Sequence, residues 1–344
     1  MTMLKILKKH WLIVFFGFLL MIFVLTFFNE VFLKSWDLTT PSAEVTIERG
    51  MTPTEIGDTL LQHGVILNPN LFLLSVKVAG VSRRLKAGHY VFSGRMNHFR
   101  ILHMLTRGQV VSLQLTFPEG IRAGGIASLL QRTLSIDSTT FMHRVTDSTL
   151  CRSHDVSVNS LEGYLYPDTY AFQYDASPDD IIHRMTERFF QLYNDTLMKR
   201  TEYLGRTVHE IVTLASIVEG EAVIDSERPI IAALYWNRLR RNMLLQSDPT
   251  IQYLIRGAPR RLLNKDLEID SPYNTYLYPG LPPGPVNNPG RASIRAVLYP
   301  DSTDVLFMVA NGDGSHTFSR NMRDHLKAKA RFDQIRRQNR RRRQ

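Results

Sequence analysis

Residues 214–222 (LASIVEGEA) place two glutamates in an otherwise apolar run, and a carboxyl group in such a setting is a candidate acid catalyst. On an α-helix of about 100° per residue, Glu219 falls inside the apolar band, whereas Glu210 and Glu221 fall near the polar side. Ile217 does not fit this partition. Burial raises the pKa of a carboxyl group, so Glu219 could hold a proton for general acid catalysis. The same pattern also fits a glutamate at the rim of an ordinary amphipathic helix.

Several predicted elements surround this helix, which we expect to begin near Thr207. Amphipathic patterns predict further helices over residues 178–193 and 229–241, and a capped helix follows Asp248. Residues 272–290 (PYNTYLYPGLPPGPVNNPG) form a long loop rich in proline and tyrosine. Long ordered loops are often functional, and aromatic rings with nearby amides suit sugars. A purely structural loop is the equally open alternative.

An uncharged, mostly apolar run covers residues 11–28, close to the lower limit for a helix that spans a membrane. Val31 to Leu33 can extend it, and Lys34, Trp36 and Asp37 resemble an interfacial anchor. Lysines precede the run, so the positive-inside rule places the N-terminus in the cytoplasm and the remaining chain outside it. The run is too long for a typical signal peptide and no small-x-small cleavage site follows, so we expect an uncleaved anchor.

The region after the anchor has the pattern of a small α+β module. Residues 38–43 read as a linker and residues 45–47 as a strand, and a capping box from Thr52 to Glu55 starts a helix. A second strand is expected over residues 85–92 and a short helix over residues 99–105. A related strand-turn-helix pattern recurs at residues 115–130, which suggests a degenerate duplication. A plain spacer between membrane and body is the alternative.

Charge and cysteine content exclude several functions. The formal net charge is +10, but it lies mainly in residues 5–9 and in the arginine tail at residues 336–344, so the body is nearly neutral and does not predict a nucleic-acid surface. The single cysteine, Cys151, allows no intramolecular disulfide and no cysteine-based metal site. No phosphate-binding glycine loop or zinc-ligand spacing occurs, so we expect no metal and no cofactor.

Ordered motifs over residues 160–325 resemble the membrane-anchored endolytic murein transglycosylase (YceG-like) family. They are LEGYLYPDTY at 161–170, LASIVEGE at 214–221, LQSDPTIQY at 245–253, SPYNTY at 271–276, GLPPGPVNNPG at 280–290 and HTF at 316–318. Residues 45–108 look like the LysM-like module of that family. The expected fold is α+β, with a transmembrane anchor (1–35), a LysM-like module and connector (44–155), a mixed α+β catalytic domain (160–335) and a basic tail (336–344).

The resemblance implies that Glu219 is the catalytic acid of a lytic transglycosylase, which cleaves the β-1,4 linkage between MurNAc and GlcNAc in nascent glycan strands and leaves 1,6-anhydroMurNAc ends. Such an enzyme would end strand elongation at the inner membrane, with peptidoglycan as substrate and peptidoglycan synthases as candidate partners. Substrate-positioning residues are expected in the groove: Gln246, Asp248, Tyr273, Asn274 and Tyr276.

One departure from the family pattern is Gly220, where a long side chain is expected, and glycine costs about 1 kcal/mol in a helix interior. The helical phase predicts that Glu221→Gln keeps much of the activity whereas Glu219→Gln loses nearly all of it. Two other functions stay open: a catalytically silent peptidoglycan-binding scaffold, and a glycoside hydrolase that pairs Glu219 with Asp248 or Glu221.

Overall fold

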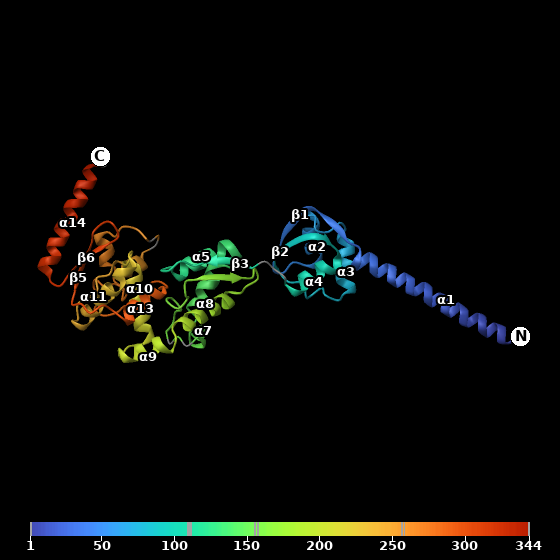
Figure 1. Ribbon diagram of the computed structural model, residues 1–344, viewed down its shortest axis with the longest axis horizontal. Coiled ribbons are helices and arrows are strands. Elements are labelled where there is room, and N and C mark those ends of the chain that lie inside the picture. The colour runs from blue at the N-terminus through green and yellow to red at the C-terminus, as the bar shows by residue number, and fades with distance from the viewer. Residues whose placement is uncertain are drawn as a thin grey trace. The chain divides into compact units, whose positions relative to one another are not determined.

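The chain divides into two compact units, which we describe one at a time (Figure 1). The computed structural model describes residues 2–108, 112–154, 156, 158–255, 257 and 259–342. The N-terminal unit contains residues 1–114 and 171–176, and the C-terminal unit contains residues 115–170 and 177–344. Residues 115–154, which the motifs grouped with the N-terminal module, therefore fold with the C-terminal unit.

The N-terminal unit begins with a long helix, α1 (Thr2–Phe28), which continues into a π-helical turn, η1 (Asn29–Leu33). The stretch Val14–Leu33 is long and apolar enough to cross a membrane. Its last turn departs from the expected anchor, because Val31 is 2% exposed and Phe32 is 5% exposed within the core of the unit. The free apolar surface therefore ends at residue 28 or shortly after it.

Trp36 also belongs to the folded unit and does not have the environment of the interfacial anchor that we expected. Its indole Nε1 donates a hydrogen bond to the backbone oxygen of Val65 at 2.9 Å. Its ring lies 4.9 Å from the ring of His98, which in turn bonds the backbone oxygen of Val31 through Nδ1. These contacts tie the end of the apolar run to the module, so the two are joined without a free linker.

A two-stranded antiparallel sheet organises this unit, in which β1 (Trp36–Ile47) pairs with β2 (Gly88–Met96). The prediction of a linker over residues 38–43 was wrong, since this stretch is part of β1. The register shifts between Asp37 and Ser42, and Pro41 lies inside the interrupted segment. Proline lacks the N–H that a strand donates, which is why it is tolerated at such an irregularity and why the strand was missed.

Three helices complete the unit. α2 (Pro53–Gln62) begins with the predicted capping box, in which Glu55 donates its backbone N–H to Thr52 Oγ1 and accepts the Thr52 N–H. α3 (Pro69–Val78) was not anticipated, and α4 (His98–Arg107) ends at Gly108, whose φ of 67° is left-handed. The core contains mainly apolar side chains from both strands and all three helices, among them Val45, Leu60, Phe72, Tyr90, Phe92 and Ile101.

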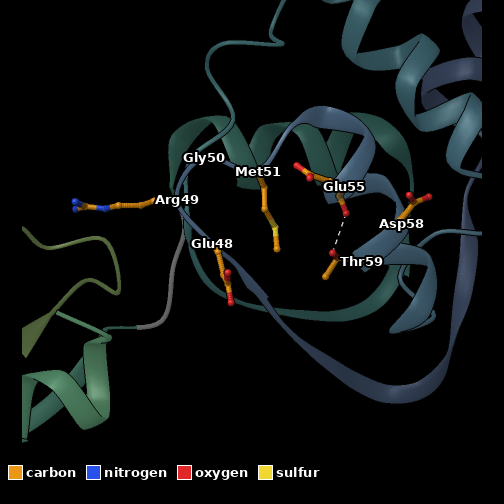
Figure 2. Close-up of a pocket in the computed structure, with 7 residues that line it drawn as sticks. All are labelled: Glu48, Arg49, Gly50, Met51, Glu55, Asp58 and Thr59. Carbon is orange, nitrogen blue, oxygen red and sulfur yellow. Dashed lines mark hydrogen bonds between the residues drawn. The ribbon is translucent and has the colours of Figure 1, made fainter. Parts of the chain in front are cut away.

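A shallow hollow of about 500 Å³ opens where β1 leads into α2. Figure 2 shows Glu48 and Met51 beside the start of α2, Arg49 pointing away, and the Thr59 hydroxyl donating to the backbone oxygen of Glu55. The Glu55 carboxylate is engaged in the helix cap, where the Thr52 backbone N–H holds its pKa below the usual value. The hollow is therefore an open depression at the start of α2. One of the carboxylates that line it, that of Glu55, caps the helix.

The C-terminal unit is mainly helical (Figure 1). The helices are α5 (Ala123–Leu134), α6 (Ser138–Val145), α7 (Ser148–Ser153), α8 (Pro178–Leu192), α9 (Asp195–Tyr203), α10 (Val208–Glu221), α11 (Arg228–Arg240), α12 (Asp248–Leu254), α13 (Arg291–Leu298) and α14 (Met322–Arg342), with short 3₁₀ turns η2 (Asp225–Glu227) and η3 (Asn264–Glu268). α10 packs against α11 and α13, and α5 packs against α6. The core thus forms around α10.

Two short strand pairs and one long loop connect these helices. β3 (Leu113–Thr116) pairs with β4 (Thr169–Phe172), and the predicted hairpin forms between β5 (Phe307–Ala310) and β6 (His316–Ser319). The predicted second strand-turn-helix pattern forms as β3 and α5, and the duplication of the β1–α2 unit stays a prediction. Residues 270–290 have no regular secondary structure, yet their interior is buried, with Asn274 and Asn288 fully inside.

Candidate active site

α10 brings both glutamates of the 214–222 motif to the same end of one helix. The helix starts at Thr207, near where the sequence predicted, and Thr207 forms a capping box with Glu210. Every residue from Ile211 to Val218 is buried, so this helix is enclosed on all sides rather than on one face. The division into an apolar and a polar face, which separated Glu219 from Glu221, does not apply here.

Glu219 forms a buried ion pair with Arg228 at the start of α11, with 3.1 Å between Oε1 and the guanidinium. Its side chain is 6% exposed, and Oε2 accepts the backbone N–H of Gly290 at 2.9 Å. Arg228 also bonds Asp225 and the hydroxyl of Ser293. Glu219 therefore joins the end of α10 to the starts of α11 and α13.

Glu221 has a different environment, and the expectation that it faces the polar side was wrong. Its Oε1 accepts hydrogen bonds from the hydroxyls of Tyr235, at 3.0 Å, and Ser247, at 2.9 Å. Burial raises the pKa of the Glu221 carboxyl, and the neighbouring Asp248 carboxylate raises it further, against weaker lowering effects that include those two hydrogen bonds. The pKa of Glu221 is displaced in the direction that a proton donor needs.

A cleft of about 610 Å³ lies beside Glu221, within the range typical of ligand sites. α10 contributes Gly220 and Glu221, and the cleft is completed by α5 with the turn before it, α12, and the 270–290 loop. The lining residues are Gly120, Arg122, Gly125, Gly220, Glu221, Asp248, Pro249, Gln252, Pro259, Val286 and Asn287. Glu221 thus combines a raised pKa with access to a cavity, which is the combination expected of a catalytic acid.

Gly220 is explained by the close approach of α12 to α10. A Cβ atom at this position would lie 2.7 Å from two side-chain carbons of Pro249, far inside van der Waals contact. Glycine lowers the helix propensity at this position, but it allows α12 to pack closely on α10. Any larger residue would prevent this contact. Local looseness of the helix, which the sequence suggested, is not needed to explain the glycine.

Two buried side chains hold the cleft walls together. The Glu162 carboxylate accepts the Ala123 N–H at the start of α5 and the Asn288 Nδ2–H, each at 3.0 Å. Asn288 also accepts from the N–H groups of Gly163 and Leu165 and donates to Ile121 O. Burial raises the pKa of Glu162 to about 7. Three segments far apart in the sequence are thereby fixed beside one another.

Of the five groove residues expected from the motifs, Asp248 lines the cleft. Tyr276 supports it, because its hydroxyl donates to Asp248 Oδ1 at 2.5 Å. Tyr273 packs its ring 5.0 Å from that of Tyr253.

The other two residues have structural or exposed positions. Asn274 is fully buried, and its amide bonds Leu267 O, Ile269 O and the Tyr276 N–H, so it braces the loop. Gln246 is exposed, with a left-handed φ of 49°.

Sequence reasoning missed several residues of the site. Arg122 and Gln252 line the cleft, and Glu162 and Asn288 position its walls. His316, in β6, bonds Glu227 through both its backbone N–H and its Nδ1, and it lies close enough to lower the pKa of Glu221. The acid of the LEGYLYPDTY motif and the paired asparagines of GLPPGPVNNPG were visible in the sequence, but nothing local indicated what they contact.

Comparisons with known proteins agree with these motifs. The model of the YceG-like family matches residues 45–331. The chain is 34% identical over 310 residues to a protein of Bacillus subtilis (strain 168) named endolytic murein transglycosylase, with 85% of each chain covered. A protein of the same name from Streptococcus pneumoniae (strain ATCC BAA-255 / R6) is 30% identical over 82% of this chain, which spans 56% of that relative's length.

A solved structure is also similar. The crystal structure of a YceG-like protein from Listeria monocytogenes aligns with a TM-score of 0.60 and 32% identity, over 83% of this chain and 98% of that one. The family model, the relatives and the solved structure together cover both units and the cleft, and the chain belongs to the YceG-like family.

Proposed function

We propose that this protein is a murein transglycosylase that cleaves peptidoglycan glycan strands in the cleft beside α10. The names of its relatives support this substrate and reaction class. The observation that carries the proposal is Glu221, a carboxyl group with a raised pKa at the wall of a cleft of about 610 Å³. A glycosidic oxygen needs a proton donor as it leaves, and Glu221 has the environment of one.

In this proposal Glu221 acts twice. It first donates its proton to the oxygen that bridges MurNAc and GlcNAc. The resulting carboxylate then accepts the proton of the MurNAc C6 hydroxyl as that oxygen bonds C1, which leaves a 1,6-anhydroMurNAc end and consumes no water. The Tyr235 and Ser247 hydroxyls donate to the carboxyl and would stabilise the anion between the two transfers.

Glu219 is the catalytic acid that the family resemblance implies, and it remains the competing assignment. Its contacts favour a positioning role, because Arg228 and the Gly290 N–H already occupy both of its oxygens. A protonated Glu219 would leave the Arg228 guanidinium, 8% exposed, with Asp225 as its remaining carboxylate partner. The geometry therefore supports Glu221 as donor and Glu219 as the group that fixes the end of α10.

A digestion experiment tests the proposal. Full-length protein in detergent, its Glu221→Gln variant and its Glu219→Gln variant are incubated with purified glycan strands, and product ends are identified by mass spectrometry. We expect anhydro ends from the native protein and none from Glu221→Gln. Intact activity in Glu221→Gln together with a folded, inactive Glu219→Gln would return the catalytic role to Glu219.

A hydrolase with two carboxylates is the second candidate, since Asp248 lines the same cleft as Glu221. Its hydroxyl partner, Tyr276, holds the Asp248 carboxylate in place. Reducing ends in the digestion products, lost on Asp248→Asn, would favour this function. A protein that binds strands and cleaves none would instead be a peptidoglycan-binding scaffold.

We also propose where the protein lies in the cell. The apolar stretch of α1 and the lysines before it support a single membrane crossing with the N-terminus in the cytoplasm and the cleft outside it. The strand-helix-helix-strand order of the N-terminal unit supports a LysM-like module. Placed at the inner membrane, the enzyme would act on nascent strands, end their elongation and work beside peptidoglycan synthases.

A further inference from the structure

Arg122 is the cationic side chain among the described residues that line the cleft. It lies directly before α5, and burial lowers the pKa of its guanidinium, against raising contributions from Glu162 and Tyr253. A guanidinium that loses water normally gains carboxylate or carbonyl partners in return. The contacts of Arg122 therefore decide whether the protein itself supplies those partners.

Among the described residues, the partner of the Arg122 guanidinium is an aromatic ring. The Arg122 guanidinium carbon lies 5.6 Å from the centroid of the Tyr253 ring. Within the described part of the chain, the Arg122 side chain has no ion pair within 4 Å and no hydrogen bond. The nearby Glu162 carboxylate uses its oxygens on Ala123 and Asn288 instead. The cation–π contact with Tyr253 leaves the N–H donors of the guanidinium available.

Asp248 and Glu221, the two acids among the described residues that line the cleft, form no ion pair with Arg122 within 4 Å. Asp248 is bonded by Tyr276, and Glu221 has a raised pKa and is bonded by Tyr235 and Ser247. The cleft thus presents one guanidinium whose N–H donors are unused. The paired N–H groups of a guanidinium match the two oxygens of a carboxylate. Neutral sugar hydroxyls would use less of this capacity.

We propose that Arg122 binds a carboxylate of the glycan strand, so that the cleft selects anionic strands over neutral ones. The inference rests on the proposed function for the identity of the polymer. Two sources carry this chemistry in peptidoglycan: the free lactyl group of a MurNAc residue without its peptide, and the carboxylates of the stem peptide. Both carboxylates belong to the MurNAc residue or its peptide, next to the linkage whose oxygen Glu221 would protonate.

The test compares binding, so that it does not depend on cleavage. Full-length protein carrying Glu221→Gln, with and without Arg122→Gln, is titrated with four strand samples. Two are strands with stem peptides and strands stripped of peptides that expose lactyl carboxylates, and the other two are the same strands with their carboxylates converted to amides. Arg132→Gln is the matched control, because Arg132 is exposed in the last turn of the same helix.

We expect Arg122→Gln to weaken binding about 10- to 100-fold for the strand type that carries the recognised carboxylate, and to leave amidated strands within about twofold. A loss confined to stripped strands identifies the lactyl group, and a loss confined to peptide-bearing strands identifies the stem peptide. Arg122→Lys should retain part of the selectivity, since it retains the charge without the fork of donors.

Equal losses on charged and amidated strands would overturn the inference, because they would mean that Arg122 only supports the fold. No loss on any strand, or no binding by the protein that retains Arg122, would overturn it as well. The proposed function fails separately: a native protein that binds anionic strands selectively but produces no new strand ends would retain the role of Arg122 and lose that of Glu221.

Discussion

The two units use burial for different ends. The core of the N-terminal unit is mainly apolar, and the ionisable side chains among its described buried residues are His98 and Tyr90. The C-terminal unit encloses Glu162, Glu219 and Arg228, and it surrounds the carboxyl group of Glu221. An apolar core contributes stability and no catalytic group. Burial of carboxyl groups in the C-terminal unit raises the pKa of Glu162 and of Glu221, and a raised pKa is what a proton donor needs.

The largest expected effect separates the two glutamates of α10. Glu221→Gln should lower the rate of strand cleavage about 10²- to 10⁴-fold while the protein stays folded, because an amide cannot donate the proton. Product formation by mass spectrometry and a thermal melt measure both quantities. Near-native cleavage by this variant would mean that the raised pKa of Glu221 has no catalytic role.

Glu219→Gln should act mainly on stability. Removing one member of a buried ion pair leaves Arg228 enclosed with less compensation, at a cost of about 3–5 kcal/mol. Chemical denaturation should show this loss, whereas Glu202→Gln, at an exposed site on α9, should leave the midpoint unchanged. A Glu219→Gln protein as stable as the native one would contradict the positioning role.

The two units should respond to pH in opposite directions. The Glu162 pKa is raised to about 7 from an ordinary 4.5, so the stability linked to it is fully present below pH 4.5 and is lost as pH rises through 7. The total change is on the order of 3 kcal/mol. Burial lowers the pKa of His98, so the stability linked to His98 is present above its ordinary value of 6.5 and is lost as pH falls below it.

Hydrogen exchange resolved by region can compare these responses. Residues 161–165 should lose protection between pH 5 and pH 8, and residues 88–107 should lose it below about pH 6.5. Glu162→Gln should flatten the first response and leave the second unchanged. Parallel pH profiles in the two regions would show that the two buried groups do not control them.

The smallest expected effect compares two glycines in helices of the C-terminal unit. Gly220→Ala gains about 1 kcal/mol of helix propensity but forces a Cβ against Pro249, so we expect a net destabilisation of about 1–2 kcal/mol. Gly124→Ala, on α5, meets nothing within 4 Å and should stabilise by up to about 1 kcal/mol. Denaturant midpoints that shift in the same direction for both variants would contradict the close packing of α10 on α12.

Local signals were read correctly from the sequence and contacts between distant residues were not. The capping box at Thr52 and the start of α10 near Thr207 depend on a few neighbouring residues, so they could be predicted. Glu221 was misplaced because a helical wheel assumes one buried face, and α10 is covered on every side by distant segments.

The cleft was harder to predict because its walls come from separate parts of the chain. Arg122 lies before a helix with no motif around it, and Asn288 makes its contacts more than a hundred residues away. Asp248 could be named because it sits in a recognisable helix start, whereas Asn274 has a similar polar side chain but is directed into its own loop. The residue type alone does not show whether a polar side chain in these segments faces the cleft, as Asp248 does, or braces its own loop, as Asn274 does.

The Asn288 amide also determines when the cleft can form. Its hydrogen bonds span 125 residues to Gly163 and 167 residues to Ile121, so both loops must close before either wall is fixed. Closing loops of this length costs conformational entropy, which is offset only when the hydrogen bonds to both segments form. Contacts between such distant residues form slowly. In a growing chain, the walls of the cleft are therefore joined only after residue 288 has been synthesised.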